Sequence, residues 1–491
     1  MITTITFLLY FAILMLIAIV AFYRTKNHAD YILGGRTLNG VLTAMGVGAS
    51  DMSGWLMMAL PGSVYLIGLS KIWMPLGLII GAWLNWQFVG KRLRVYTEVA
   101  SNSLTIPAYF SNRFHDTSGI LRTITGLVIL IFFTFYSSSS FVAGAKLFSS
   151  TFDISYQHAL WICSLLIVIY TSIGGFLAVN WVDLFQGTLM LFALLILPAV
   201  AYFNLDTNLF DTVKEVNEHA VTLFKDISIL GVISLLAWGL GYFGQPHILV
   251  RFMAARGKAD IQLGKRVCMT WMILSLTGAV ATGFIGTAFF VDNPLQIHDA
   301  ENVFLKLAQL LFNPWIAGIL LAAVLSAIIS TVAAQLLASS SAFAEDFYRT
   351  VLRKKASQQE LIWAGRMAVV VVALIALWLA RDPESSVLPL VSYAWAGLGA
   401  AFGPVVLCSL YWRNMTRNSA LFGMIFGAST IFIWDIFAKL YPHNYWAGLY
   451  EIIPAFIMGF VGIWLGKFIG QPVAENIVNT FNDMELQLAK K

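Results

Sequence analysis

One carboxylate, Asp51, stands inside a long apolar stretch, with no Lys or Arg within one or two helical turns. If this stretch crosses a membrane, an unpaired charge at that depth costs about 2.5–3.5 kcal/mol on insertion scales, so it calls for a compensating partner. A bound cation is the simplest partner, and the alternative is a protonated or hydrogen-bonded structural aspartate. Ser53, two residues further on, can supply a hydroxyl or carbonyl oxygen to the same region.

A second group of oxygens occurs in the apolar stretch 314–338. Ser330 and Thr331 lie among alanines, and Ala327 precedes them by one helical turn, so its carbonyl can point to the same place as their hydroxyls. Na+ is a hard cation that needs several oxygens, and carbonyls with hydroxyls supply them without excess charge. The alternative is that each hydroxyl donates only to the carbonyl four residues earlier in its own helix.

Trp238, Tyr242 and Pro246 recur every four residues and would share one face of an α-helix. Such a stripe is either packing or part of a pocket. On an interrupted helix it can enclose a small apolar ring, such as that of a cyclic amino acid.

The composition indicates which elements must position these groups. Of the 491 residues, 59% are hydrophobic and only 11% are charged, whereas ordinary soluble domains carry about 25% charged residues. Long apolar runs predict membrane-spanning helices. We therefore expect an all-α polytopic membrane protein in a lipid bilayer. About 13 transmembrane helices are predicted, at 3–23, 42–66, 71–90, 122–145, 158–179, 183–203, 228–250, 267–291, 314–338, 360–380, 387–411, 419–440 and 449–468.

Several classes of protein are excluded. No hydrophilic stretch exceeds about 30 residues, which leaves no room for a nucleotide-binding or signalling domain. The chain has no P-loop pattern, no pair of histidines at metal-binding spacing and no paired cysteines. Its cations are spread over many loops, so no nucleic-acid partner is predicted. We expect neither an enzyme nor a bound cofactor.

The distribution of Lys and Arg predicts the orientation. One set of loops holds 23 of the 30 cations, and the positive-inside rule places that set in the cytoplasm. The N-terminus is then outside and the C-terminus cytoplasmic, which agrees with an odd number of spans. The first span, 3–23, lacks a basic leader and a cleavage site, so we expect it to be retained.

Two predicted spans carry clusters of Gly and Pro. The second has glycines and a proline around Asp51, and the seventh has three glycines before Pro246. Non-helical backbone inside a membrane is tolerated only where it lines a cavity or is buried in protein. A pair of such discontinuous helices at corresponding positions points to the binding site of a transporter.

The two discontinuous spans, helices 2 and 7, begin two blocks of five helices each. Five spans per block place the second block in the opposite orientation, which predicts an inverted five-plus-five repeat. We expect a single transmembrane transporter domain over 1–491, with an extra N-terminal helix at 3–23, repeats at 42–203 and 228–411, two extra helices at 419–468, and a cytoplasmic tail at 470–491.

Five stretches resemble the sodium:solute symporter family, and the likeness extends from about Lys26 to Phe468. They are GASDMSGW (48–55), GGFLAVNWVD (174–183), WGLGYFGQPHIL (238–249), FNPWIAGILLAAVLSAIIST (312–331) and SYAWAGLGAAFGPVVL (392–407). Val182 and Ala59 depart from the residues expected in the family, Thr and Gly respectively.

The resemblance implies roles for individual residues. Asp51, with Ser53 beside it, matches an intramembrane aspartate important for Na+ binding, and Ser330 and Thr331 match the hydroxyl pair of the Na+ site. The backbone-carbonyl donors to Na+ match Ala49, Met52 and Ala327. Residues associated with the substrate match Ser53, Gly54, Tyr136, Trp238, Tyr242 and Pro246. The charged residues linked to gating and coupling match Arg36 and Asp183.

The same resemblance implies Na+-coupled symport of L-proline by alternating access, in the bacterial inner membrane. L-proline and Na+ are then the expected small-molecule partners, with Na+ as coupling ion, while the oligomeric state is left open. The alternative is another small solute of the same family, such as pantothenate or another organic acid. A channel, from a different class, would show unsaturable conductance in place of saturable, Na+-dependent accumulation.

Overall fold

A computed structural model describes residues 2–24, 33–173, 176–225, 227–291, 299–469 and 473–490. Within these ranges the secondary structure is helical, apart from one isolated bridge between Leu38 and Ala255. The expected all-α class is therefore confirmed. Lys26, Gly174, Gly175 and Lys491, which entered the sequence argument, lie outside the described residues.

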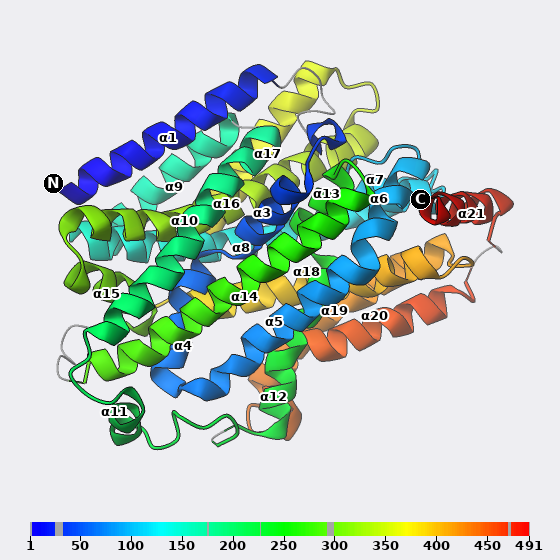
Figure 1. The fold of residues 1–491 in the computed structure, drawn as a ribbon. Helices are drawn as coiled ribbons and strands as arrows, with labels where there is room; N and C mark the ends of the chain where they lie inside the picture. The colour runs from blue at the N-terminus through cyan, green and yellow to red at the C-terminus, as the bar shows by residue number, and fades with distance from the viewer. Residues whose placement is uncertain are drawn as a thin grey trace.

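The longest helices make up most of the bundle (Figure 1). They are α1 (Ile2–Arg24), α8 (Ile120–Phe152), α10 (Phe176–Phe203), α14 (Lys258–Phe289), α16 (Pro314–Ser341), α17 (Gln358–Leu379), α18 (Val387–Tyr411) and α19 (Arg417–Leu440). Two shorter apolar helices, α9 (Tyr156–Ile173) and α20 (Ile452–Gly466), pack beside them. The 3-10 or π segments are η1 (Gly34–Arg36), η2 (Trp55–Ala59), η3 (Leu69–Ile72), η4 (Asn85–Gly90), η5 (Ala237–Gly244), η7 (Ala300–Asn302), η8 (Ala342–Leu352) and η9 (Tyr445–Gly448). Shorter α-helices are α3 (Gly40–Asp51), α4 (Leu60–Ile67), α5 (Trp73–Leu84), α6 (Lys91–Val99), α7 (Ile106–Arg113), α11 (Leu209–Val216), α12 (Ile229–Leu236), α13 (Pro246–Ala254), α15 (Val303–Leu311) and α21 (Glu475–Ala489).

In the described part of the chain, nine helices are long and apolar enough to cross a membrane, or ten when the bent pair 229–244 and 246–254 counts as one span. Three further apolar helices are shorter, at Trp55–Ile67, Tyr156–Thr171 and Ile452–Gly466. Multiple spans are thus confirmed, whereas the number thirteen stays a prediction.

Several predicted boundaries differ from the helix bounds, and three of the differences concern buried charged residues. The interruption expected between 179 and 183 is absent, because α10 begins at Phe176 and contains Asp183. The seventh span was expected to end at 250, yet α13 continues to Ala254. The ninth was expected to end at 338, yet α16 and η8 continue to Leu352. In each case polar residues that suggested a loop are buried inside the bundle, at Asp183, Arg251 and Asp346.

The first break follows α3. The Asn39 side chain accepts a hydrogen bond from Leu42 N at the start of α3. The helix ends at Asp51, Met52 leaves helical geometry with φ −83° and ψ 82°, and a π-helical turn, η2, begins at Trp55. Gly54 allows this crossing, since a Cβ there would lie 2.6 Å from Ala143 Cβ of α8.

The second break lies between α12 and α13. The intervening η5 is a 3-10 helix, and the two halves of the span are bent by 46°. Gly241 is required by a close approach, because a Cβ there would lie 1.9 Å from Trp395 Nε1 of α18. Both helices predicted to be discontinuous are therefore discontinuous.

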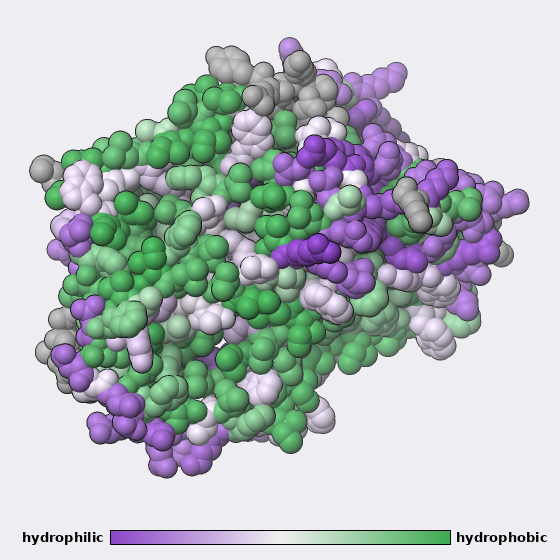
Figure 2. All heavy atoms as spheres, viewed as in Figure 1, coloured by the Kyte–Doolittle hydropathy of each residue, from purple (hydrophilic) through white to green (hydrophobic). Residues whose placement is uncertain are grey.

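The broken spans lie at the centre of the bundle. Figure 1 shows α3, α13, α16 and α18 there, with α1, α9 and α17 along one side and α19 and α20 along another. Apolar residues cover most of the visible flank, and hydrophilic residues gather at the end where α6, α7 and α21 lie (Figure 2). Leu8, Leu165, Phe192 and Ile433 are among the exposed apolar residues of the bundle, which fits contact with lipid.

Candidate functional site

A cluster of buried oxygens joins the end of α3 to the middle of α16. In a continuous helix the Ala49 carbonyl would accept a hydrogen bond from Ser53 N, but Ser53 N donates to the Asp51 carbonyl instead, at 3.0 Å. The Ala49 carbonyl accepts from Ser330 Oγ at 2.7 Å and from Thr331 Oγ1 at 3.5 Å. Ser330 Oγ also lies 3.2 Å from the Ala327 carbonyl.

This cluster has the chemistry of a site for a monovalent cation. Its two hydroxyls and two carbonyls carry no net charge, and all four residues are at most 1% exposed. Hard cations such as Na+ prefer oxygen ligands of this kind. Met52 is also buried and stands at the break, where its main chain has left helical geometry. The sequence-predicted residues Ala49, Ala327, Ser330 and Thr331 are thus brought together.

The side chain of Asp51 faces a different neighbour. Its Oδ2 accepts a hydrogen bond from the Tyr242 hydroxyl of η5. Its Oδ1 is buried without a protein partner, and within the described ranges no Lys or Arg pairs with it. The Asp51 carbonyl accepts from Trp55 Nε1 at 3.2 Å and from the Tyr136 hydroxyl at 3.4 Å. Asp51 therefore links both breaks and α8, beside the oxygen cluster.

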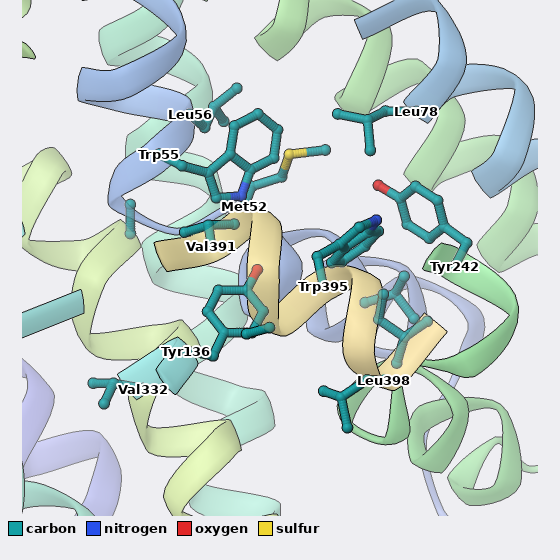
Figure 3. Close-up of a cluster of buried hydrophobic side chains, with 14 of the residues drawn as sticks. Met52, Trp55, Leu56, Leu78, Tyr136, Tyr242, Val332, Val391, Trp395 and Leu398 are labelled. Atoms are coloured by element: carbon teal, nitrogen blue, oxygen red, sulfur yellow. The ribbon is translucent and has the colours of Figure 1, made fainter. Parts of the chain in front are cut away.

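Aromatic side chains form a buried cluster with Tyr242, the residue that donates to Asp51. In Figure 3, Tyr136, Tyr242 and Trp395 lie around one cluster with Met52 and Trp55. The rings of Tyr242 and Trp395 meet edge to face, with centroids 5.1 Å apart. All of these residues are nearly or fully buried. Such a set offers apolar faces together with hydroxyl and indole donors, which suits a small, partly apolar solute.

Trp238, Tyr242 and Pro246 do not share one face. Because η5 is a 3-10 helix with about three residues per turn, positions four apart point in different directions. The Trp238 ring stacks on Tyr450, with centroids 5.4 Å apart, and its carbonyl accepts from Trp395 Nε1 at 2.7 Å. Pro246 begins α13 and lines a separate cavity with Arg251. The expectation of a single stripe is corrected accordingly.

Arg36 of η1 forms hydrogen bonds with α13 and with the loop after α6. Its guanidinium donates to the Met253 carbonyl, to the Ser103 carbonyl at 3.0 Å and to Asn102 Oδ1 at 2.9 Å. Burial, and next the nearby Arg94, lower the pKa of Arg36 to about 10. The side chain therefore remains charged at neutral pH.

Asp183 is held by an arginine that the sequence argument assigned to a loop. Arg251 Nη2 donates to Asp183 Oδ2 at 3.0 Å, and both side chains are at most 2% exposed. Arg251 also donates to the His247 carbonyl one turn earlier. The signal in the sequence was an Arg directly after an apolar span that could pair with an acid inside another apolar stretch.

Two more residues of this region were not singled out as candidates. Trp395 falls within one of the resembling stretches, but an aromatic residue in an apolar span carries no special signal. Gln245 at the second break donates from Nε2 to the Trp395 carbonyl at 3.0 Å, while its Oε1 is buried without a protein partner. Together they attach the broken span to α18.

Comparison with known proteins decides the family. The model of the sodium:solute symporter family matches residues 31–427. The chain belongs to this family. It is therefore a Na+-coupled transporter of a small molecule, a multi-pass membrane protein and not an enzyme.

Individual relatives cover almost the whole chain. The sodium/proline symporter of Escherichia coli (strain K12) is 53% identical, over 95% of this chain and 93% of the relative. The high-affinity proline transporter PutP of Bacillus subtilis (strain 168) is 47% identical, over 96% and 99%. Among solved structures, a Na+-coupled sialic acid symporter in a substrate-bound outward-open state matches with a TM-score of 0.77 and 18% identity, over 97% of this chain and 99% of that one. The last likeness concerns the fold alone.

Proposed function

We propose that this symporter couples the entry of Na+ to the uptake of L-proline by alternating access. The observation that carries the proposal is the Ala49 carbonyl, which the break after α3 releases toward the hydroxyls of Ser330 and Thr331. Relatives of 53% and 47% identity that are named as proline transporters support the choice of solute.

In this mechanism Na+ binds between α3 and α16. Its ligands are the carbonyls of Ala49, Met52 and Ala327 and the hydroxyls of Ser330 and Thr331. When Na+ binds, the two hydroxyls no longer donate to the carbonyls, and their oxygen lone pairs contact the ion instead. Bound Na+ then fixes the break in the position in which it can contribute to the solute site.

L-proline binds next to the ion, between the two breaks. Ser53 and Gly54 provide main-chain and hydroxyl contacts at the first break, while Tyr136 and Tyr242 contact the ring, and Trp238 and Pro246 flank this place at the two ends of η5. The apolar pyrrolidine ring suits the aromatic faces, and the carboxylate and ammonium groups suit the hydroxyl donors and Asp51. Asp51 thus acts on both partners, because it approaches the ion and accepts from Tyr242.

Arg36 and Asp183 act on gating and coupling away from the solute. Each joins segments from different parts of the chain, Arg36 through main-chain carbonyls and Asp183 through Arg251. Rearranging these contacts accompanies the movement of one helix group relative to the other.

We further propose that the protein lies in the bacterial inner membrane with its N-terminus outside and its C-terminus in the cytoplasm. Figure 1 places the N-terminus and α21 at opposite ends of the bundle, and the hydrophilic residues of Figure 2 gather at the end of α21. Na+ would then enter with the membrane potential, which contributes about 2.3 kcal/mol per charge per 100 mV.

The substrate is tested by competition in proteoliposomes. With an inward Na+ gradient, we expect accumulation of labelled L-proline that saturates with concentration and collapses without Na+. Excess unlabelled L-proline should abolish the signal, whereas pantothenate and other organic acids should leave it. Suppression by one of those solutes at lower concentration than L-proline would contradict the assignment of substrate, and unsaturable flux would favour a channel.

A further inference from the structure

Two cavities follow one another between Pro246 and the hydrophilic end of the bundle. The inner cavity, of about 50 Å³, is lined by Pro246, Arg251, Ala338, Ser341 and Asp346 among others. A cavity of this size has room for a few water molecules. The outer cavity, of about 220 Å³, is lined mostly by residues with polar side chains, among them Asn102, Asn112, Arg122 and Arg349.

An ion pair separates the two cavities. Leu104 and Thr105 line both of them, Asp346 lines the inner one and Arg122 lines the outer one. Arg122 Nε donates to Asp346 Oδ1 at 2.6 Å. Thr105 Oγ1 lies 3.5 and 3.4 Å from the two carboxylate oxygens. The Asp346 side chain is fully buried, whereas that of Arg122 is 29% exposed toward the hydrophilic end.

Two of the three residues come from elements that also build the ion and solute sites. Asp346 lies in η8, which continues α16 without a gap, sixteen residues after Ser330, or about 24 Å along a helix. Arg122 is in the first turn of α8, the helix that carries Tyr136. Thr105 caps α7, where its side chain accepts from Ala108 N at 3.1 Å. A shift of α16 relative to α7 and α8 must therefore break these contacts.

A purely structural role explains this position poorly. A buried ion pair gains little net stability over well-packed apolar residues, because removing two charges from water offsets their attraction. Here the two partners line neighbouring cavities, Asp346 the inner one and Arg122 the outer one. Asp346 lies in the continuation of α16, the helix that holds proposed Na+ ligands. Arg122 in α8 and Thr105 at the start of α7 belong to helices that hold none of these ligands.

We propose that the Arg122–Asp346 pair, with Thr105, is the barrier that closes the cytoplasmic exit of the solute path. The inference rests on the proposed function for the direction of transport. While Na+ holds α16 against α3, the pair stays closed and the inner cavity is sealed. When α16 moves away from α7 and α8, the pair separates, the cavities join, and the solute site opens to the cytoplasm. Arg122, Asp346 and Thr105 are positioning residues, since they contact neither the ion nor the solute site.

The test measures access to the inner cavity with a thiol reagent. In a background where Cys163, Cys268 and Cys408 are replaced by alanine, Ala338→Cys places one thiol on the cavity wall. Inside-out vesicles are then treated with a membrane-impermeant maleimide, which reaches the cytoplasmic face only. We expect Asp346→Asn to raise the labelling rate at least fivefold. Arg122→Lys, which keeps the charge, should change it less than twofold.

The control removes a carboxylate from another ion pair. Asp435 pairs with Lys439 at 2.7 Å on the exposed side of α19, and Asp435→Asn should label at the parent rate. Arg122→Gln provides a second opening variant at a partly exposed side chain if Asp346→Asn fails to fold. An unchanged labelling rate in folded Asp346→Asn or Arg122→Gln protein would overturn the proposal, as would faster labelling from the outside face only.

Labelling requires no transported solute, so the two proposals can fail separately. Faster labelling of the variants in a protein that does not take up L-proline would support the proposed barrier and contradict the proposed substrate. Normal L-proline uptake with an unchanged labelling rate in the variants would contradict the proposed barrier alone.

Discussion

At the scale of single residues, three of the buried aspartates, Asp51, Asp183 and Asp346, differ in their partners. Asp183 pairs with Arg251 and Asp346 with Arg122, whereas Asp51 has only the Tyr242 hydroxyl and a free Oδ1. The residues around Asp51 suggested an ion site, because its apolar neighbours contain no cation. Asp183 was a candidate only through the family resemblance and Asp346 was not a candidate, since pairs formed between distant segments leave no local pattern. Of these three aspartates, Asp51 is the one without a cationic side-chain partner, which leaves it available to a mobile cation.

Tyr242→Phe should weaken the response to Na+ while keeping the ring. The hydroxyl stabilises and orients the Asp51 carboxylate, and a buried acceptor that loses its donor costs about 1–3 kcal/mol. We expect about a tenfold rise in the Na+ concentration that gives half-maximal uptake, because tenfold corresponds to about 1.4 kcal/mol. Tyr65→Phe, on α4 and away from Asp51, serves as the control. Equal Na+ dependence in the two variants would show that the hydroxyl has no such role.

At the scale of elements, clusters of Gly and Pro predicted both broken helices, since these residues weaken regular helix wherever they gather. The same patterns could not give the geometry of each break. Trp238 and Tyr242 share a face only in an α-helix, and the tight packing of η5 on α18 makes that segment 3-10. Polar residues such as Asp183 suggested a helix end, because the local sequence does not reveal the distant residue that pairs with them inside the bundle.

Gly241→Ala tests the contact between the second break and α18. The added methyl would meet Trp395 Nε1, and overpacking of this kind costs about 1–3 kcal/mol. We expect a lower melting temperature in detergent and reduced L-proline uptake. At Gly257 a Cβ would meet nothing within 4 Å, so Gly257→Ala should match the parent. A Gly241→Ala protein as stable and active as Gly257→Ala would contradict the described packing.

The Asp183–Arg251 pair connects α10 with α13. Removing one partner of a buried pair costs about 3–5 kcal/mol, whereas replacing both is much milder. Asp183→Asn and Arg251→Gln should each lower the melting temperature strongly, and the double variant should lie closer to the parent. Thermal unfolding of all four proteins checks this. Additive losses in the double variant would mean that the two side chains do not depend on each other.

At the scale of the whole molecule, the sequence predicted a helical membrane protein with two discontinuous spans, and the fold agrees with it. A TM-score of 0.77 at 18% identity shows that this architecture is kept while most side chains change. The fold by itself therefore does not identify the solute. The inverted repeat explains how two breaks, far apart in sequence, meet at one place.

A shared site makes the two ligands mutually dependent. If Na+ raises the affinity for L-proline by some factor, L-proline must raise the affinity for Na+ by the same factor, typically about 5–150-fold. Equilibrium binding of labelled L-proline at several Na+ concentrations, together with Na+ titrations at several L-proline concentrations, measures both. In the purified protein, the factor should be the same in both directions. If neither affinity depended on the other ligand, the Na+ and L-proline sites would not be coupled.

The most direct measurement is the Na+ dependence of L-proline accumulation in proteoliposomes that contain the parent or the Ser330→Ala, Thr331→Ala double variant. Ser326→Ala is the control on the same helix, because the Ser326 hydroxyl contacts Tyr10 and the Ala322 carbonyl instead of Ala49. We expect Na+-driven accumulation in the parent and the control, and a shift of more than tenfold to higher Na+ in the double variant. Asp51→Asn should shift in the same direction. Accumulation that needs no Na+, or an unchanged Na+ dependence in the double variant, would contradict the proposed function.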